Sequence, residues 1–96
     1  MSDFVRKEFL RYIYQFVLNK KYEKAEMFIN YLIENEEDIN LVNWYLEFKK
    51  LLYVRPLIIC QRVRDYFEEA QENLKYTREK EKLLWEKRVR KKDIFG

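Results

Sequence analysis

The sequence of 96 residues lacks histidine, and it has one glycine, one proline and one cysteine. Because histidine most often moves protons near neutral pH, its absence removes the usual acid–base and metal-binding chemistry. The one glycine is Gly96, so no glycine-rich loop is present to bind phosphate. Cys60 alone forms neither a disulfide nor a thiolate zinc site. We therefore expect a protein that is not an enzyme and has no cofactor and no metal site.

The sequence is rich in apolar and charged residues. Hydrophobic residues make up 48% of the chain, aromatic residues 18% and charged residues 39%. This hydrophobic content is typical of a folded domain rather than a disordered tail, and the length suits a single domain. The high charge content is also typical of proteins from hot environments.

Neither a secretion signal nor a membrane span is expected. The first eight residues carry too many charges for the apolar stretch of a signal peptide. The longest apolar run, residues 51–60, is interrupted by Arg55 and Pro56 and is too short to cross a bilayer. The sequence thus predicts a cytoplasmic protein in a reducing environment.

Apolar residues recur at spacings of three and four along the chain, which predicts an all-α fold. We expect one helix over residues 3–18, a second over 22–34, a third that ends at 53–56, and a fourth from Pro56. The apolar face expected for the first helix is Val5, Phe9, Tyr12, Ile13 and Phe16. The apolar face expected for the third helix is Leu41, Trp44, Tyr45, Phe48, Leu51 and Leu52. The short turn at 19–21 favours an antiparallel hairpin of the first two helices. The predicted architecture is a small bundle of three or four helices, in which the hairpin and the third helix pack on a long C-terminal helix.

Residues suited to helix ends stand at the expected boundaries. Ser2 or Asp3 is expected to cap the first helix, and Asp38 or Asn40 the third. Asn19 is expected to end the first helix in the left-handed conformation, since no glycine is available there.

After Pro56 no helix-breaking residue follows for about 35 residues. A helix of that length spans roughly 50 Å, whereas a domain of this size is about 30–35 Å across. The last helix is therefore expected to project, to bend or to meet a second copy. We divide the chain into a helical core domain, 1–76, and a basic C-terminal helical extension, 77–96.

The basic residues of the extension are the strongest indication of function. Residues 78–96 carry eight basic and four acidic side chains, whereas residues 20–40 carry three and six. Five basic residues suited to phosphate or to an acidic surface stand within six positions: Lys87, Arg88, Arg90, Lys91 and Lys92. The alternative is that they are solvated and complement the negative end of a helix dipole.

Trp85, with Leu84 and Val89, is expected to anchor a protein partner, because large aromatic residues beside arginine dominate protein interfaces. The alternative is that the last helix bends at Thr77 and Trp85 covers the hairpin of the first two helices. A homodimer along the last helix is also open, although Thr77 and Glu81 interrupt the apolar seam.

Other reactive side chains have simpler interpretations. The acidic residues of the fourth helix are expected to form a solvated face rather than a cation site; they are Asp65, Glu68, Glu69 and Glu72. Cys60 is expected to be a buried small apolar residue.

The sequence therefore predicts a non-catalytic helical interaction module. It would be an accessory subunit or small regulator that docks on a larger assembly, including one that handles nucleic acid, or on itself. The alternative is direct binding of DNA or RNA by the basic segment. No membrane and no small-molecule substrate is expected.

Overall fold

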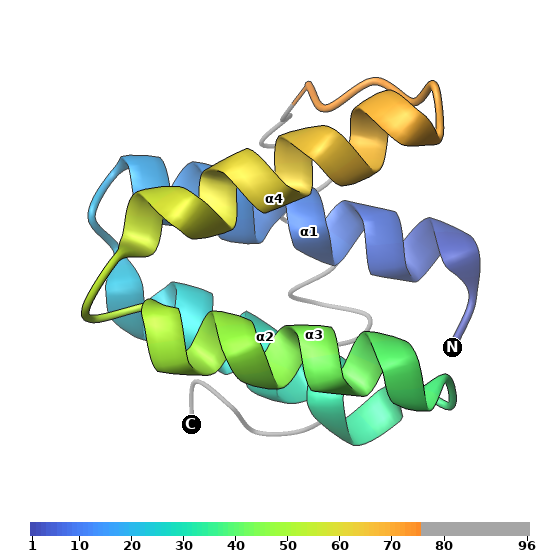
Figure 1. The fold of residues 1–96 in the computed structure, drawn as a ribbon, viewed down its shortest axis with the longest axis horizontal. Helices are drawn as coiled ribbons and strands as arrows, with labels where there is room; N and C mark the ends of the chain where they lie inside the picture. The colour runs from blue at the N-terminus through green and yellow to red at the C-terminus, as the bar shows by residue number, and fades with distance from the viewer. Residues whose placement is uncertain (76–96) are drawn as a thin grey trace.

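The computed structural model describes residues 1–75, which form four α-helices and no strand. The helices are α1 (Asp3–Leu18), α2 (Tyr22–Asn35), α3 (Ile39–Leu51) and α4 (Pro56–Glu69). The chain reverses direction at each connection, and α1 and α3 each pack against both α2 and α4 (Figure 1). The prediction of an all-α fold is confirmed over these residues.

Aromatic rings fill the centre of the domain. Phe9 of α1 stacks on Tyr31 of α2, with ring centroids 4.4 Å apart. Phe16 and Phe28 meet edge-on with centroids 5.1 Å apart. Burial of each such ring contributes roughly 2–3 kcal/mol. The apolar face predicted for the first helix is fully inside the core: Val5, Phe9, Tyr12, Ile13 and Phe16.

Three helices begin where the sequence predicts, at residues suited to helix starts. Ser2 Oγ accepts a hydrogen bond from the Val5 amide at 3.2 Å. Asp38 caps α3 by accepting from the Asn40 amide at 2.9 Å. Pro56 is the first residue of α4, where its missing N–H leaves no bond unmade. These three starts confirm the sequence prediction.

The end of α1 differs from the prediction by one residue. Asn19 has φ −93°, and the left-handed residue is Lys20 with φ 59°. The Lys20 amide donates to the Val17 carbonyl at 3.1 Å, and the Lys21 amide donates to the Phe16 carbonyl at 2.8 Å. These two hydrogen bonds at the end of the helix require the left-handed conformation in the residue after the C-cap, which is Lys20.

The prediction of one helix continuing from Pro56 toward the C-terminus is wrong, because α4 ends at Glu69. Gln71 adopts φ 55°, and its amide donates to the Glu68 carbonyl at 3.1 Å. The Glu72 amide donates to the Phe67 carbonyl at 2.9 Å. Residues 68–73 contain one apolar side chain, so a continued helix would bury little there.

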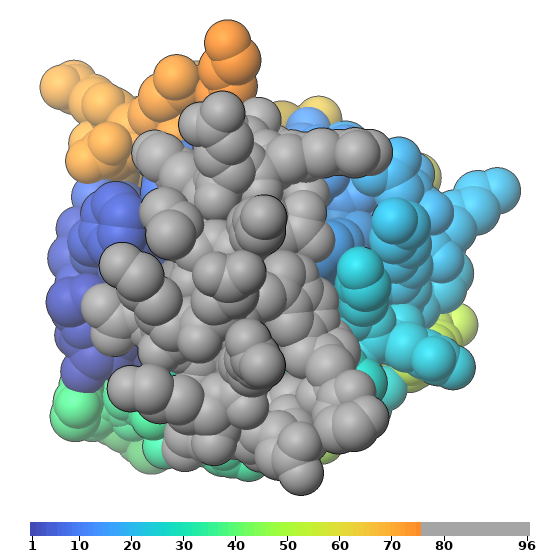
Figure 2. Space-filling view, turned by 180° about the vertical axis from the view of Figure 1, so that it is seen from behind, coloured from blue at the N-terminus to red at the C-terminus, as the bar shows by residue number. Residues whose placement is uncertain are grey.

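Residues 70–75 fold back on α1 instead of extending α4. Arg11 Nε donates to the Asn73 carbonyl at 2.6 Å, and Lys7 Nζ pairs with Glu72 at 3.0 Å. Leu74 packs against the core. Figure 2, from behind, shows this segment in orange above the first half of α1. The chain therefore reaches Lys75 beside α1, and the predicted extension, 77–96, lies outside the described residues.

None of the helices α1–α4 combines the length and the hydropathy that crossing a bilayer requires.

We predict that Lys20→Gly stabilises the protein by about 0.5–1 kcal/mol, because glycine removes the side-chain clash of the left-handed conformation. Urea unfolding of the full chain measures this. Asn19→Gly is the matched control and brings no gain, because φ at Asn19 is negative. Equal destabilisation by the two substitutions would contradict the argument.

Candidate partner-binding groove

The residues predicted from the sequence to contact a partner or phosphate all lie outside the described residues. They are Leu84, Trp85, Lys87, Arg88, Val89, Arg90, Lys91 and Lys92. The structure neither brings them together nor separates them, and their roles stay predictions. Residues 1–75 contain a different feature suited to partner binding, which is a groove between α3 and α4.

This groove has a volume of about 500 Å³. Helices α3 and α4 both face the viewer in Figure 1. The α4 side uses positions 62, 65, 66 and 69, whose spacing places them on one helical face. The lining residues are Asp38, Asn40, Leu41, Trp44, Arg62, Asp65, Tyr66 and Glu69. We call these residues the α3–α4 groove.

Two aromatic rings form the apolar part of the groove. The rings of Trp44 and Tyr66 have centroids 5.3 Å apart and are tilted by 31°. Trp44 also contacts the buried Phe48, with centroids 4.5 Å apart. Both groove rings are partly buried, so one side of the pair packs on the core and the other lines the groove.

The polar part of the groove is acidic. Asp38, Asp65 and Glu69 are exposed carboxylates along it. The one basic lining residue, Arg62, pairs through Nη1 with Glu47 at 2.7 Å. Neither Asp65 nor Glu69 forms an ion pair with any of residues 1–75. Among residues 1–75, Asp65 and Glu69 therefore have no cationic partner, and they lie beside partly exposed aromatic surface.

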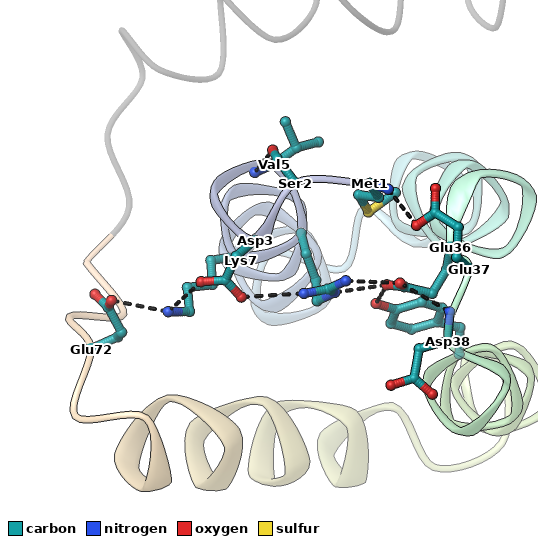
Figure 3. A network of polar contacts seen from close by, with 11 residues as sticks. Met1, Ser2, Asp3, Val5, Lys7, Glu36, Glu37, Asp38 and Glu72 are labelled. Atoms are coloured by element: carbon teal, nitrogen blue, oxygen red, sulfur yellow. Dashed lines mark hydrogen bonds and ion pairs between the residues drawn. The ribbon is translucent and has the colours of Figure 1, made fainter.

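A buried ion-pair network fixes the loop that carries Asp38. Arg6 of α1 donates to both carboxylate oxygens of Glu36, from Nε at 2.7 Å and from Nη2 at 2.8 Å. The Tyr45 hydroxyl donates to the same carboxylate at 2.7 Å, and the Asp38 amide donates at 3.4 Å. Figure 3 shows the carboxylate at the meeting point of these groups. The loop between α2 and α3 is thus tied to both α1 and α3.

A second set of ion pairs surrounds the start of α1 (Figure 3). Lys7 Nζ pairs with Asp3 at 2.8 Å and with Glu72, and the amino group of Met1 pairs with Glu37. The Lys7 ammonium lowers the pKa of Asp3, and the chain amino group lowers the pKa of Glu37. These pairs connect the start of the chain to the segment after α4 and to the loop between α2 and α3.

The same contacts shift the titration of the buried groups. The hydrogen bonds from Arg6 lower the pKa of Glu36 to about 2, and the Tyr45 hydroxyl and the Asp38 amide add to this effect. Burial raises the pKa of Tyr45, and the neighbouring carboxylate raises it further. The pKa of Arg6 is raised by its hydrogen bonds to Glu36. Glu36 is therefore ionised and Tyr45 protonated at neutral pH.

The remaining sequence predictions concern α4 and the segment after it. Asp65, Glu68 and Glu69 are exposed, and Glu72 pairs with Lys7. Residues 1–75 contain no cluster of three or more acidic or cysteine residues placed to hold a metal ion. Cys60 is buried, as predicted, and burial raises the pKa of its thiol.

The chain matches no known protein family, and it matches neither a curated protein nor a solved structure.

The sequence reasoning missed the groove although part of its signal was available. Asp65, Tyr66 and Glu69 share one face with Arg62 by spacing alone. Trp44 was assigned to the core face of the third helix, and it packs there with only part of its ring. That the two faces oppose each other depends on how α3 and α4 pack, which periodicity does not specify.

We predict that Glu36→Gln removes a pH-dependent part of the stability. Because the pKa of Glu36 is lower in the folded state than the ordinary 4.5, its contribution is fully present above pH 4.5 and is lost as the pH falls toward about 2. The shift corresponds to on the order of 3 kcal/mol. Unfolding in urea at several pH values should show a large deficit at pH 7 that closes toward pH 2.

The control for this series is Glu68→Gln, which changes an exposed carboxylate on α4. It should keep the wild-type stability and pH dependence. A Glu36→Gln deficit that stays constant from pH 7 to pH 2 would contradict the assigned role of the carboxylate.

Proposed function

We propose that the protein is a non-catalytic helical interaction module, an accessory subunit or small regulator. It docks on a larger assembly or on a second copy. Leu84, Trp85 and Val89 contact a protein partner. Acidic surface or phosphate is bound by the neighbouring basic residues, which are Lys87, Arg88, Arg90, Lys91 and Lys92.

The observation that carries this proposal is the separation of charge along the chain. Residues 1–75 carry 12 basic and 13 acidic side chains, whereas residues 78–96 carry eight and four. The helical domain also has an acidic groove with two partly exposed rings, Trp44 and Tyr66. A chain with one basic apolar segment and one acidic aromatic groove has two surfaces of the kind that proteins use to recognise each other.

The carboxylates with a lowered pKa within residues 1–75 have a structural role, which also supports the proposal. The carboxylates whose pKa is lowered are Asp3, Glu36 and Glu37, and each is in an ion pair. Each pair joins α1 or the N-terminus to another part of the chain or stabilises the first turn of α1. The lowered pKa values of these three carboxylates are therefore explained by ion pairs that stabilise the fold.

We predict that Trp85→Ala weakens partner binding about thirtyfold while leaving the thermal unfolding of the domain unchanged, as expected for an aromatic anchor at an interface. The measurement is quantitative retrieval of partners by the full-length tagged chain, with proteins identified by mass spectrometry. Phe4→Ala is the matched control, because Phe4 is an aromatic residue exposed at 62% on α1.

Two outcomes would contradict this prediction. In the first, Trp85→Ala lowers the unfolding temperature by several degrees at every protein concentration, which would assign Trp85 to the core of the domain. In the second, a chain ending at Lys75 retrieves the same partners as the full chain, which would place the binding surface within the helices.

A second candidate function is direct binding of DNA or RNA. The specific observation in its favour is that five of the six residues 87–92 are basic. About five phosphate contacts give a log–log dependence of duplex affinity on salt with a slope of about −4 to −5.

The salt dependence separates the two functions. If the basic segment binds nucleic acid, fluorescence anisotropy with a mixed-sequence duplex shows this slope, and Arg88→Ala with Lys91→Ala reduces it by about two. A slope near zero, or no binding at low salt, excludes this candidate and leaves the protein partner.

A further inference from the structure

We infer that the α3–α4 groove binds residues 84–92 of a second copy of the chain, so that two copies exchange these segments. The inference rests on the proposed function, because it gives the partner-binding residues a specific receptor. The segment is expected to place Leu84 and Trp85 on the aromatic part of the groove and its basic residues along the acidic part.

The aromatic rings of the groove are suited to contact with another aromatic side chain. Trp44 and Tyr66 are held in place on their inner side by Phe48 and Phe67, with centroid distances of 4.5 Å and 5.7 Å. A rigid, partly exposed aromatic pair accepts another aromatic side chain with little loss of conformational entropy. Trp85 is the largest apolar side chain of residues 76–96 and therefore buries the most area on this pair.

The charges of the groove and of the segment 84–92 are complementary. Asp65 and Glu69 are one helical turn apart, about 6 Å along the axis of α4. Neither has a cationic partner within residues 1–75, and Arg62 is already paired with Glu47. The segment 84–92 carries five basic residues and one acidic residue. When the segment docks, its basic side chains form ion pairs with Asp65 and Glu69. These pairs lie beside apolar surface, where screening by water is weaker.

A second copy is the occupant that uses all of these surfaces. Each chain contributes its α3–α4 groove and its segment 84–92, so a two-fold pair occupies both α3–α4 grooves and both segments and then closes. The eight residues 76–83 span up to about 28 Å when extended, which is enough to cross to a neighbouring domain. Within residues 1–75 the groove is open to solvent between α3 and α4.

The test is sedimentation equilibrium of the full-length chain and its charge variants. Wild type should form a dimer that weakens with salt. Glu69→Lys should raise the dimer dissociation constant at least about tenfold. Glu68→Lys is the matched control: it makes the same charge change on the same helix, but Glu68 does not line the groove. It should leave the dimer intact.

Charge exchange between two chains tests the pairing itself. A chain with Asp65→Lys and Glu69→Lys, and another with Arg88→Glu and Lys91→Glu, should each be monomeric alone. Their equimolar mixture should recover the dimer, because the unchanged groove and segment meet at one contact, and at the other contact the two reversed groove charges face the two reversed segment charges. A mixture that stays monomeric overturns the inference.

Other occupants of the groove give distinct results. A chain that is monomeric at all concentrations, while Glu69→Lys shifts the indole signal of Trp85 in an NMR spectrum, would show that its own segment is bound. A dimer insensitive to Glu69→Lys would place self-association elsewhere. Both results overturn the inference. A monomer that still loses a protein partner through Trp85→Ala overturns only the exchange and leaves the proposed function in place.

Discussion

The arrangement of the helices depends on the buried ion pair of Arg6 and Glu36. The Glu36 side chain is 1% exposed and accepts both guanidinium hydrogen bonds and that of Tyr45, so the loop after α2 is fixed to α1 and α3 together. Removing the Arg6 guanidinium would leave the Glu36 carboxylate buried without a cationic partner within residues 1–75, which commonly costs about 3–5 kcal/mol. Through the Asp38 amide, the same carboxylate also fixes the residue that begins α3 and lines one end of the groove.

A second constraint is the scarcity of glycine. The chain closes α1 and α4 with the same pair of hydrogen bonds, and it places Lys20 and Gln71 in the left-handed conformation that glycine usually occupies. At α4 this closure turns the chain back toward α1, where Arg11 binds the Asn73 carbonyl and its guanidinium lies 4.8 Å from the Phe67 ring. The absence of a helix breaker after Pro56 therefore did not commit the chain to a continuous helix.

The sequence was sufficient for features that depend on local pattern. Periodicity placed α1 and its buried face correctly, and the capping residues Ser2 and Asp38 marked two helix starts. It was insufficient where contacts between residues distant in sequence determine the structure. Nothing near Arg11 in the chain indicates that its partner is a carbonyl 62 residues away, and that contact stabilises the end of α4. The groove was missed for the same reason, since each of its two faces looks like an ordinary amphipathic helix until α3 and α4 are packed together.

The account as a whole links an acidic aromatic groove on a firmly held helical domain to a basic apolar segment of the same sequence. Zero-length carbodiimide cross-linking of an equal mixture of ¹⁴N- and ¹⁵N-labelled chains tests this link most directly, because it joins carboxylates to lysines in direct contact. The account predicts mixed-isotope cross-links from Asp65 and Glu69 to Lys87, Lys91 or Lys92. Cross-links from these carboxylates only within one chain, or none to the basic segment, would contradict it.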